Sequence, residues 1–190
     1  MLVLGLSGSL RRDSHNRKLL RAAARELPPG TRLAAWEGLA DIPPYDQDLD
    51  VAPAPPAVRR LRDALAAADA VLISTPEYNS SIPGVLKNAL DWASRPFPNN
   101  ALRDKPVAVV GASTGLFGAV WAQAETRKVL KTIGARVVDH ELPVGQADRA
   151  FDDDGRLVDP ELRAELTEVV GDLLREVTAP VEAERAAALT

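Results

Sequence analysis

The sequence predicts an α/β protein built on a doubly wound, five-stranded parallel sheet of order 2-1-3-4-5, with helices on both faces. Short apolar runs alternate with longer segments of helical periodicity along the chain. Runs that are apolar at almost every position indicate strands covered on both sides, as in parallel sheets. Because crossovers between parallel strands are right-handed, few windings are possible.

Each element follows from a local pattern. Strands are expected at residues 2–6, 31–36, 70–74 and 106–112, with a fifth beginning at 136–139. Helices are expected at residues 15–27, 57–68, 82–93, 119–133 and 160–176. Pro28, Pro29 and Gly30 end the first helix, Pro83 suits the first turn of the third, and Gly134 closes the fourth.

Length and composition set the broad class. The 190 residues are 46% hydrophobic and 26% charged, which is ordinary for a globular chain. We expect one domain over residues 1–177 and a C-terminal tail, frayed or helical, over 178–190. The absence of cysteine excludes disulfides, thiolate metal ligands and a cysteine nucleophile.

Charge and hydropathy limit the partners. A net charge of −4 argues against broad nucleic-acid binding. No apolar run approaches the ~20 residues that cross a bilayer. The chain starts directly into a strand-like run with no leader pattern, so we expect a cytoplasmic protein with neither membrane nor nucleic-acid partners.

The turn after the first strand contains many anion-binding groups. Residues 5–16 read GLSGSLRRDSHN. Ser9 and Ser14 can donate hydroxyl hydrogen bonds, Arg11 offers a fork of N–H donors, and Ser14 or Asn16 could cap the next helix, whose N-terminus also favours a phosphate. The Walker and G-x-G-x-x-G spacings are absent. The turn therefore predicts a terminal phosphate, the alternative being plain capping beside solvated arginines.

Two further turns leave the same predicted edge. Residues 75–84 read TPEYNSSIPG and residues 111–119 read GASTGLFGA. In such sheets a ligand lies beyond the carboxyl ends of the strands, where the winding reverses. A proline-fixed turn with a tyrosine, facing a glycine-rich one, suits a flat heterocycle. The alternatives are a surface loop and a flexible turn.

The stretches GSLRRDSHNRKLL and PEYNSSIPGVLKNALDW together resemble the NADPH-dependent FMN reductase family, flavodoxin-like enzymes that include bacterial quinone, azo-dye and chromate reductases. The likeness runs from the first strand to about residue 140. One departure is Gly118-Ala119, where many relatives have paired glycines.

The resemblance implies FMN as cofactor and assigns its binding residues. The phosphate would be held by Ser9, Arg11, Ser14 and Asn16. The isoalloxazine ring would be bordered, largely through backbone groups, by Pro76, Glu77, Tyr78 and Asn79. Its other edge would be approached by Ser113, Thr114 and Gly115.

These inferences predict an NAD(P)H oxidoreductase that passes hydride through FMN to a quinone-like, azo, flavin or metal-oxyanion acceptor. Neither catalytic side chains nor a metal site are expected, because His15 and His140 have no partners at useful spacing. The alternatives are a flavodoxin-type electron carrier and a non-catalytic phosphate- or flavin-binding module.

The sequence leaves two features open. NADH and NADPH are both possible co-substrates, with Arg11 and Arg12 as candidate ligands of a 2′-phosphate. Trp92 and Trp121 are either ordinary core residues or part of a contact in a homodimer or homotetramer.

Overall fold

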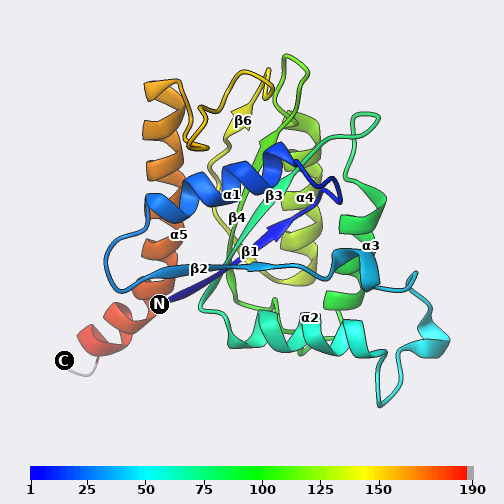
Figure 1. Ribbon diagram of the computed structural model, residues 1–190. Coiled ribbons are helices and arrows are strands. Elements are labelled where there is room, and N and C mark those ends of the chain that lie inside the picture. The colour runs from blue at the N-terminus through cyan, green and yellow to red at the C-terminus, as the bar shows by residue number, and fades with distance from the viewer. Residues whose placement is uncertain (188–190) are drawn as a thin grey trace.

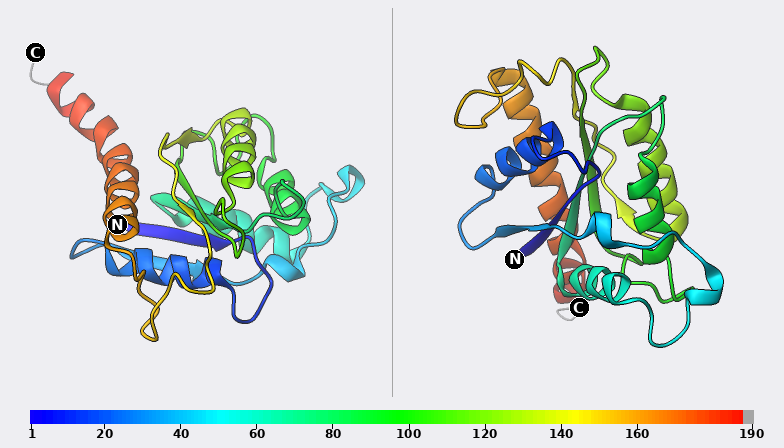
Figure 2. Two further views of the ribbon diagram at one scale, coloured as in Figure 1. Left: turned by 90° about the horizontal axis from the view of Figure 1, so that it is seen from above. Right: turned by 45° about the vertical axis from the view of Figure 1, so that its right-hand side comes forward.

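The computed structural model describes the backbone of residues 1–187 and confirms the predicted fold class. A parallel sheet is flanked by helices on both faces (Figures 1 and 2). The strands are β1 (Leu2–Ser7), β2 (Arg32–Trp36), β3 (Ala70–Thr75), β4 (Pro106–Ala112), β5 (Arg136–Val137) and β6 (Pro143–Val144). The helices are α1 (His15–Arg25), α2 (Pro56–Ala67), α3 (Gly84–Ala93), α4 (Val120–Ile133) and α5 (Pro160–Ala187), with short 3₁₀ turns at Leu39–Asp41 and Gln47–Leu49.

The strand order β2-β1-β3-β4-β5 is the predicted 2-1-3-4-5. Every residue of β3 and of β4 is buried, as expected of central strands covered on two faces. Residues of α1 and α5 bury one side of the sheet, and residues of α2, α3 and α4 bury the other. The left view of Figure 2 shows these two helical layers with the sheet between them.

The fifth strand is interrupted, which the sequence did not predict. β5 pairs with the start of β4, and β6 pairs with its end. Between them lie Asp139, His140 and Glu141, whose polar side chains do not suit a strand buried on both faces. A buried side chain replaces part of the ladder, because Leu142 N donates to Gln123 Oε1 at 3.2 Å.

Helix ends differ slightly from the expected bounds. Pro83 lies at the N-cap of α3 rather than inside its first turn, and Gly134 closes α4 with a left-handed φ of 101°. α5 continues without a break past residue 177 to Ala187, so the described part of the tail is helical. The proposed division at 177/178 stays a prediction.

Candidate active site

The three turns singled out by sequence leave the sheet at one edge. In the parallel register Ser7 lies opposite Ser74, and Thr75 lies opposite Gly111. β1, β3 and β4 therefore end level with one another. The segments that follow them, which we call loop one (residues 8–14), loop three (76–83) and loop four (113–119), share the carboxyl edge of the sheet.

Loop one presents the donors that a phosphomonoester requires. Ser9 and Ser14 are buried, and each hydroxyl oxygen accepts from a backbone N–H, of Arg11 and Arg17 respectively, at 3.3 Å. Each hydroxyl thus accepts one bond within the loop and keeps a proton that can donate to a ligand. Ser14 is the N-cap of α1, so the free N–H groups of the first helical turn point the same way. The exposed Arg11 adds a positive charge, and together these groups fit the phosphate of FMN.

The Asn16 side chain is engaged in hydrogen bonds within the protein. It is buried and bonded on both sides: Oδ1 accepts from Ser74 Oγ at 2.8 Å and Ala112 N at 3.0 Å, and Nδ2 donates to Ala112 O at 2.9 Å. The amide ties the start of α1 to the ends of β3 and β4. Its backbone N–H, in the first turn of α1, is the group left to face a phosphate.

Loop three is a tight hairpin turn. Tyr78 and Ser81 exchange two backbone hydrogen bonds of 3.2 Å, and Asn79 and Ser80 between them have φ of 53° and 59°. This is the conformation of a two-residue type I′ turn, in which asparagine is favoured. The turn holds Tyr78 half exposed at the rim, where a flat ring can lie against it. Pro76 precedes the turn, its carbonyl accepting from Thr75 Oγ1 at 2.8 Å.

Two glutamates fasten loop three to α4. Glu77 Oε2 accepts from Trp121 N at 3.0 Å and Ala122 N at 3.1 Å, so its carboxylate caps the helix rather than facing a cofactor. Glu125 Oε2 accepts from Ser81 Oγ at 2.6 Å and from Ile82 N. These hydrogen bonds, that of Ser81 first, lower the pKa of Glu125. Because the Glu77 carboxylate is bonded to α4, we expect Glu77 to contact a ring through its backbone.

Loop four is fixed by backbone contacts to the segment after β6. Ser113 O accepts from Ala147 N, and Gly115 O accepts from Gln146 N, both at 3.0 Å. Gly118 has a φ of 57°, and a Cβ there would lie 2.3 Å from the carbonyl carbon of Pro143. The backbone approach at Gly118 therefore requires glycine.

The predicted loop-four residues lie at the open rim. Ser113 is half-buried, whereas Thr114 and Gly115 are exposed. Ala119 adopts a left-handed φ of 63°. The chain thus keeps a glycine-like backbone at this position despite its methyl group.

Sequence reasoning missed the side chains that hold these loops. Gln123 is fully buried, and its Nε2 donates to Gly118 O at 3.1 Å while its Oε1 holds Leu142. It also missed an exposed aromatic pair, Phe117 and Trp121, with ring centroids 5.2 Å apart. For Gln123, the available signal was a glutamine on the apolar stripe of α4, which indicates a buried polar group with partners.

Trp92 and Trp121 lie in different environments. The side chain of Trp92 is fully buried and packs edge-on against Tyr45, with ring centroids 4.9 Å apart. Its Nε1 donates to Pro43 O at 2.8 Å. Trp92 is therefore a core residue of this chain. Trp121 is 47% exposed at the start of α4.

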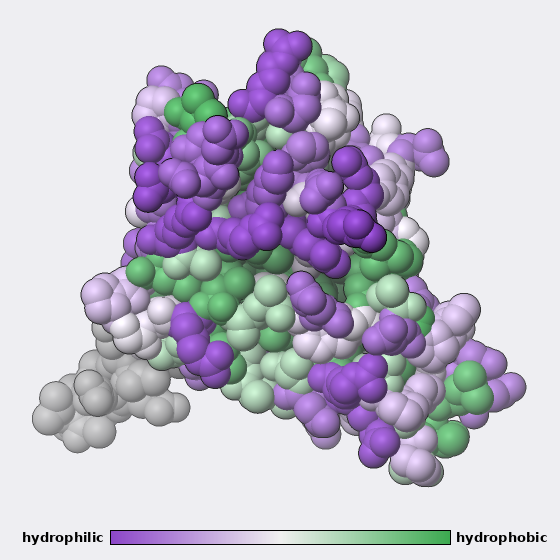
Figure 3. All heavy atoms as spheres, viewed as in Figure 1, coloured by the Kyte–Doolittle hydropathy of each residue, from purple (hydrophilic) through white to green (hydrophobic). Residues whose placement is uncertain are grey.

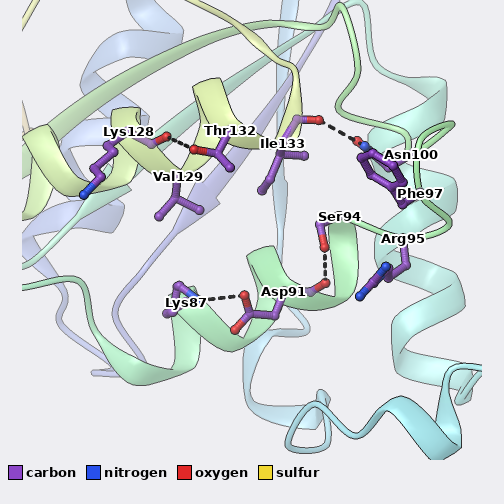
Figure 4. Close-up of a pocket in the computed structure, with 10 residues that line it drawn as sticks. All are labelled: Lys87, Asp91, Ser94, Arg95, Phe97, Asn100, Lys128, Val129, Thr132 and Ile133. Carbon is purple, nitrogen blue, oxygen red and sulfur yellow. Dashed lines mark hydrogen bonds and ion pairs between the residues drawn. The ribbon is translucent and has the colours of Figure 1, made fainter.

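A separate hollow of about 450 Å³ lies between α3 and α4 (Figure 4). It is lined at the C-terminal ends of both helices by residues that include Arg95, Phe97 and Thr132. The Lys87–Asp91 ion pair, 2.6 Å long, crosses part of it. None of the predicted binding residues lines this hollow, which lies toward the opposite edge of the sheet.

Among the side chains that the structure describes, those of residues 1–179, no group of three or more acidic or histidine residues could hold a metal ion. His140 pairs with Asp172 at 3.1 Å on the surface of the α5 layer, and His15 stacks on Phe151. Partial burial, with Lys18 and Arg11 nearby, lowers the pKa of His15. No helix in the described region is long and apolar enough to cross a membrane.

Comparison with known proteins agrees with this geometry. The family model described as NADPH-dependent FMN reductase matches residues 1–149. An NAD(P)H-dependent FMN reductase of Pseudomonas aeruginosa is 44% identical over 162 residues, covering 85% of this chain and 86% of the relative. A quinone reductase of Pseudomonas putida is 40% identical over 153 residues, covering 80% and 82%.

A solved structure shares the whole architecture. The flavoenzyme NAD(P)H:(acceptor) oxidoreductase FerB of Paracoccus denitrificans superposes with a TM-score of 0.82 at 36% identity, covering 94% of this chain and 97% of that one. With the family match spanning most of the chain, this protein belongs to the NADPH-dependent FMN reductase family.

Proposed function

We propose that this protein is an FMN-dependent NAD(P)H oxidoreductase whose electron acceptor is a small quinone-like molecule. The observation that carries the proposal is the convergence of loops one, three and four at one sheet edge, with phosphate donors on the first and a rigid, open rim on the other two. The quinone is proposed because a relative 40% identical to this chain is a quinone reductase.

The residues of loop one would anchor the cofactor. Hydroxyl protons of Ser9 and Ser14, the guanidinium of Arg11 and the first N–H groups of α1 would hold the phosphate. Because Asn16 fixes α1 to the sheet, these donors are preorganised before the ligand arrives.

Loops three and four would position the ring. Backbone N–H groups of Asn79 and Ser80 lie outside the hydrogen-bonded pair of the hairpin and would favour negative charge at the ring edge. Pro76, Glu77 and Tyr78 would line one border, and Ser113, Thr114 and Gly115 the other. When bound, FMN supplies the hydride chemistry, so the protein needs no acid–base side chain of its own.

The test is anaerobic reduction. Purified protein with bound FMN is mixed with NADPH, and the visible absorbance of oxidised flavin is followed, with benzoquinone added afterwards. We expect bleaching by NADPH and return of the absorbance with the quinone. No bleaching with either NADPH or NADH would refute the oxidoreductase; bleaching without steady turnover on quinone would instead favour an electron carrier.

We also propose that the chain assembles as a homodimer or homotetramer. The support is the exposure of Phe117 and Trp121 beside the rim, since contiguous exposed aromatic side chains are typical of contact surfaces. Sedimentation at micromolar concentration should give a mass above that of one chain, and a monomer would remove the proposal.

A further inference from the structure

A slot of about 190 Å³ lies between α1 and β2, on the edge of the molecule next to loop one. It is separate from the rim formed by loops three and four. Figure 3 shows this side of the protein: a band of hydrophilic side chains crosses the face at α1, and an apolar strip lies beside it toward β2. We call this feature the α1–β2 slot.

The floor of the slot is flat and apolar. Gly5 and Ala35 contribute almost no side chain, and Leu33 packs so closely that a Cβ on Gly5 would lie 2.6 Å from its Cδ2. A side chain at residue 5 would therefore displace Leu33 from the slot floor. A smooth apolar surface bounded by small residues suits a planar heterocycle such as a purine.

Two arginines and one carboxylate, that of Glu37, line the slot. Arg17 and Arg21 are one helical turn apart on α1, and both line the slot. Like charges at this spacing disfavour a helix. Within the described residues neither guanidinium takes part in an ion pair, whereas Arg62 on α2 is paired with Asp50 at 2.8 Å. Their guanidiniums together offer several N–H donors for a phosphate.

The slot adjoins the cofactor site. Ser7 lines the slot, and its Oγ accepts from Ser9 N of loop one at 3.4 Å. β1 and β2 are neighbours, about 4.8 Å apart in a sheet. Glu37, exposed directly after β2, lines the same slot and offers an acceptor for a ribose hydroxyl. The slot therefore lies directly beside loop one, where the cofactor phosphate is proposed to bind.

We propose that the α1–β2 slot binds the adenosine end of NADPH, and that Arg17 and Arg21 recognise its 2′-phosphate. The inference rests on the proposed function, because it assumes that the co-substrate is a nicotinamide nucleotide. It assigns NADPH preference to α1 and not to Arg11 and Arg12 of loop one.

A binding experiment tests the slot without turnover. Adenosine 2′,5′-bisphosphate is titrated calorimetrically into FMN-loaded protein, in which loop one is already filled, and ADP is titrated in parallel. We expect the bisphosphate to bind at least tenfold more tightly than ADP, from charge-assisted hydrogen bonds to the 2′-phosphate. Equal affinities, or no binding of either, would overturn the proposal while leaving the flavin chemistry untouched.

Variants of α1 test which residues give the preference for NADPH over NADH. In the Arg17→Ala/Arg21→Ala protein the ratio of kcat/KM for NADPH to that for NADH should fall at least tenfold, and Arg17→Lys/Arg21→Lys should recover part of it. Lys18→Ala removes the same charge from the same turn but does not line the slot, so it should leave the ratio within about twofold. An equal loss with both nucleotides, or an equal effect of Lys18→Ala, would refute recognition of the 2′-phosphate by the slot.

Discussion

The two edges of the sheet hold their loops by different means. At the carboxyl edge the connecting side chains are polar and buried, among them Ser9, Ser14, Asn16, Ser74 and Gln123. At the amino edge most contacts are on the surface: Asp69 Oδ2 accepts from Leu2 N at 2.7 Å, and the amino terminus donates to Gly30 O, both exposed to solvent. Asn100 is the buried exception there, its Nδ2 donating to Ile133 O at 3.1 Å.

This difference indicates which edge is functional. A buried polar group costs about 1–3 kcal/mol of folding free energy when its hydrogen bonds are lost. Such groups therefore fix a structure in one arrangement, and any change that breaks their hydrogen bonds destabilises the fold. Stability alone is served by apolar packing, as in the fully buried residues of β3 and β4. Polar anchoring is concentrated where loops must keep fixed positions around a ligand.

The largest expected effect is a loss of FMN affinity in a double variant of loop one. Ser9→Ala with Arg11→Ala removes two of the proposed phosphate donors, and charge-assisted hydrogen bonds contribute roughly 1.5–3 kcal/mol each, so FMN affinity should fall by about 4 kcal/mol. A fluorescence titration of FMN measures it. Arg12→Ala is the control and should bind FMN within twofold of the parent. An unchanged affinity in the double variant would remove loop one from the site.

Asn16→Ala should weaken the fold itself. It leaves the Ser74 hydroxyl and the N–H and C=O of Ala112 without their partner, which should lower the free energy of unfolding by about 3 kcal/mol. Urea denaturation measures the loss. Asp69→Ala, the matched change at the amino edge, should cost less than about 1 kcal/mol because its bond is exposed. Equal costs would contradict the contrast between the two edges.

Glu77→Ala tests the tie between loop three and α4. The carboxylate accepts from two N–H groups at the start of the helix, and loss of such a cap costs about 1 kcal/mol. Glu77→Gln keeps an acceptor oxygen and should recover much of the stability in the same denaturation assay. If the glutamine variant is no better than the alanine variant, the capping role is wrong.

The smallest effect is a pH dependence of loop three. The pKa of Glu125 is lowered by its bonds to Ser81 and Ile82, so ionised Glu125 stabilises the loop above the ordinary carboxyl pKa. That stabilisation is lost as pH falls through the lowered pKa of the folded protein. The protection factor of the Ile82 amide against hydrogen exchange should fall on acidification, and Glu125→Gln should abolish this dependence. Identical profiles in both proteins would exclude Glu125 as the cause.

Sequence periodicity was enough for the sheet order, because buried strands and right-handed crossovers leave little choice. It was not enough for the fifth strand, whose break at residues 139–141 depends on tertiary contacts of Glu141 with Arg127 and of Leu142 with Gln123. Periodicity identifies which face of an element is buried but not which distant backbone group a polar side chain will reach.

The same limit applies to the site. The motif drew attention to Asn16 at the start of α1 and to Glu77 in loop three, but it did not predict the hydrogen bonds that both side chains make within the protein. A residue type that can bind a ligand can equally bind the backbone, and only the positions of neighbouring strands decide between them. The positive φ of Asn79 and Ser80 was likewise not deduced, although asparagine in a short polar turn favours it.

A crystal structure of the protein with FMN tests the central claim most directly. We expect the phosphate within hydrogen-bonding distance of the Ser9 and Ser14 hydroxyls, and the ring between Tyr78 and Ser113 at the carboxyl edge. FMN bound instead in the hollow between α3 and α4, or with its phosphate away from loop one, would contradict the account.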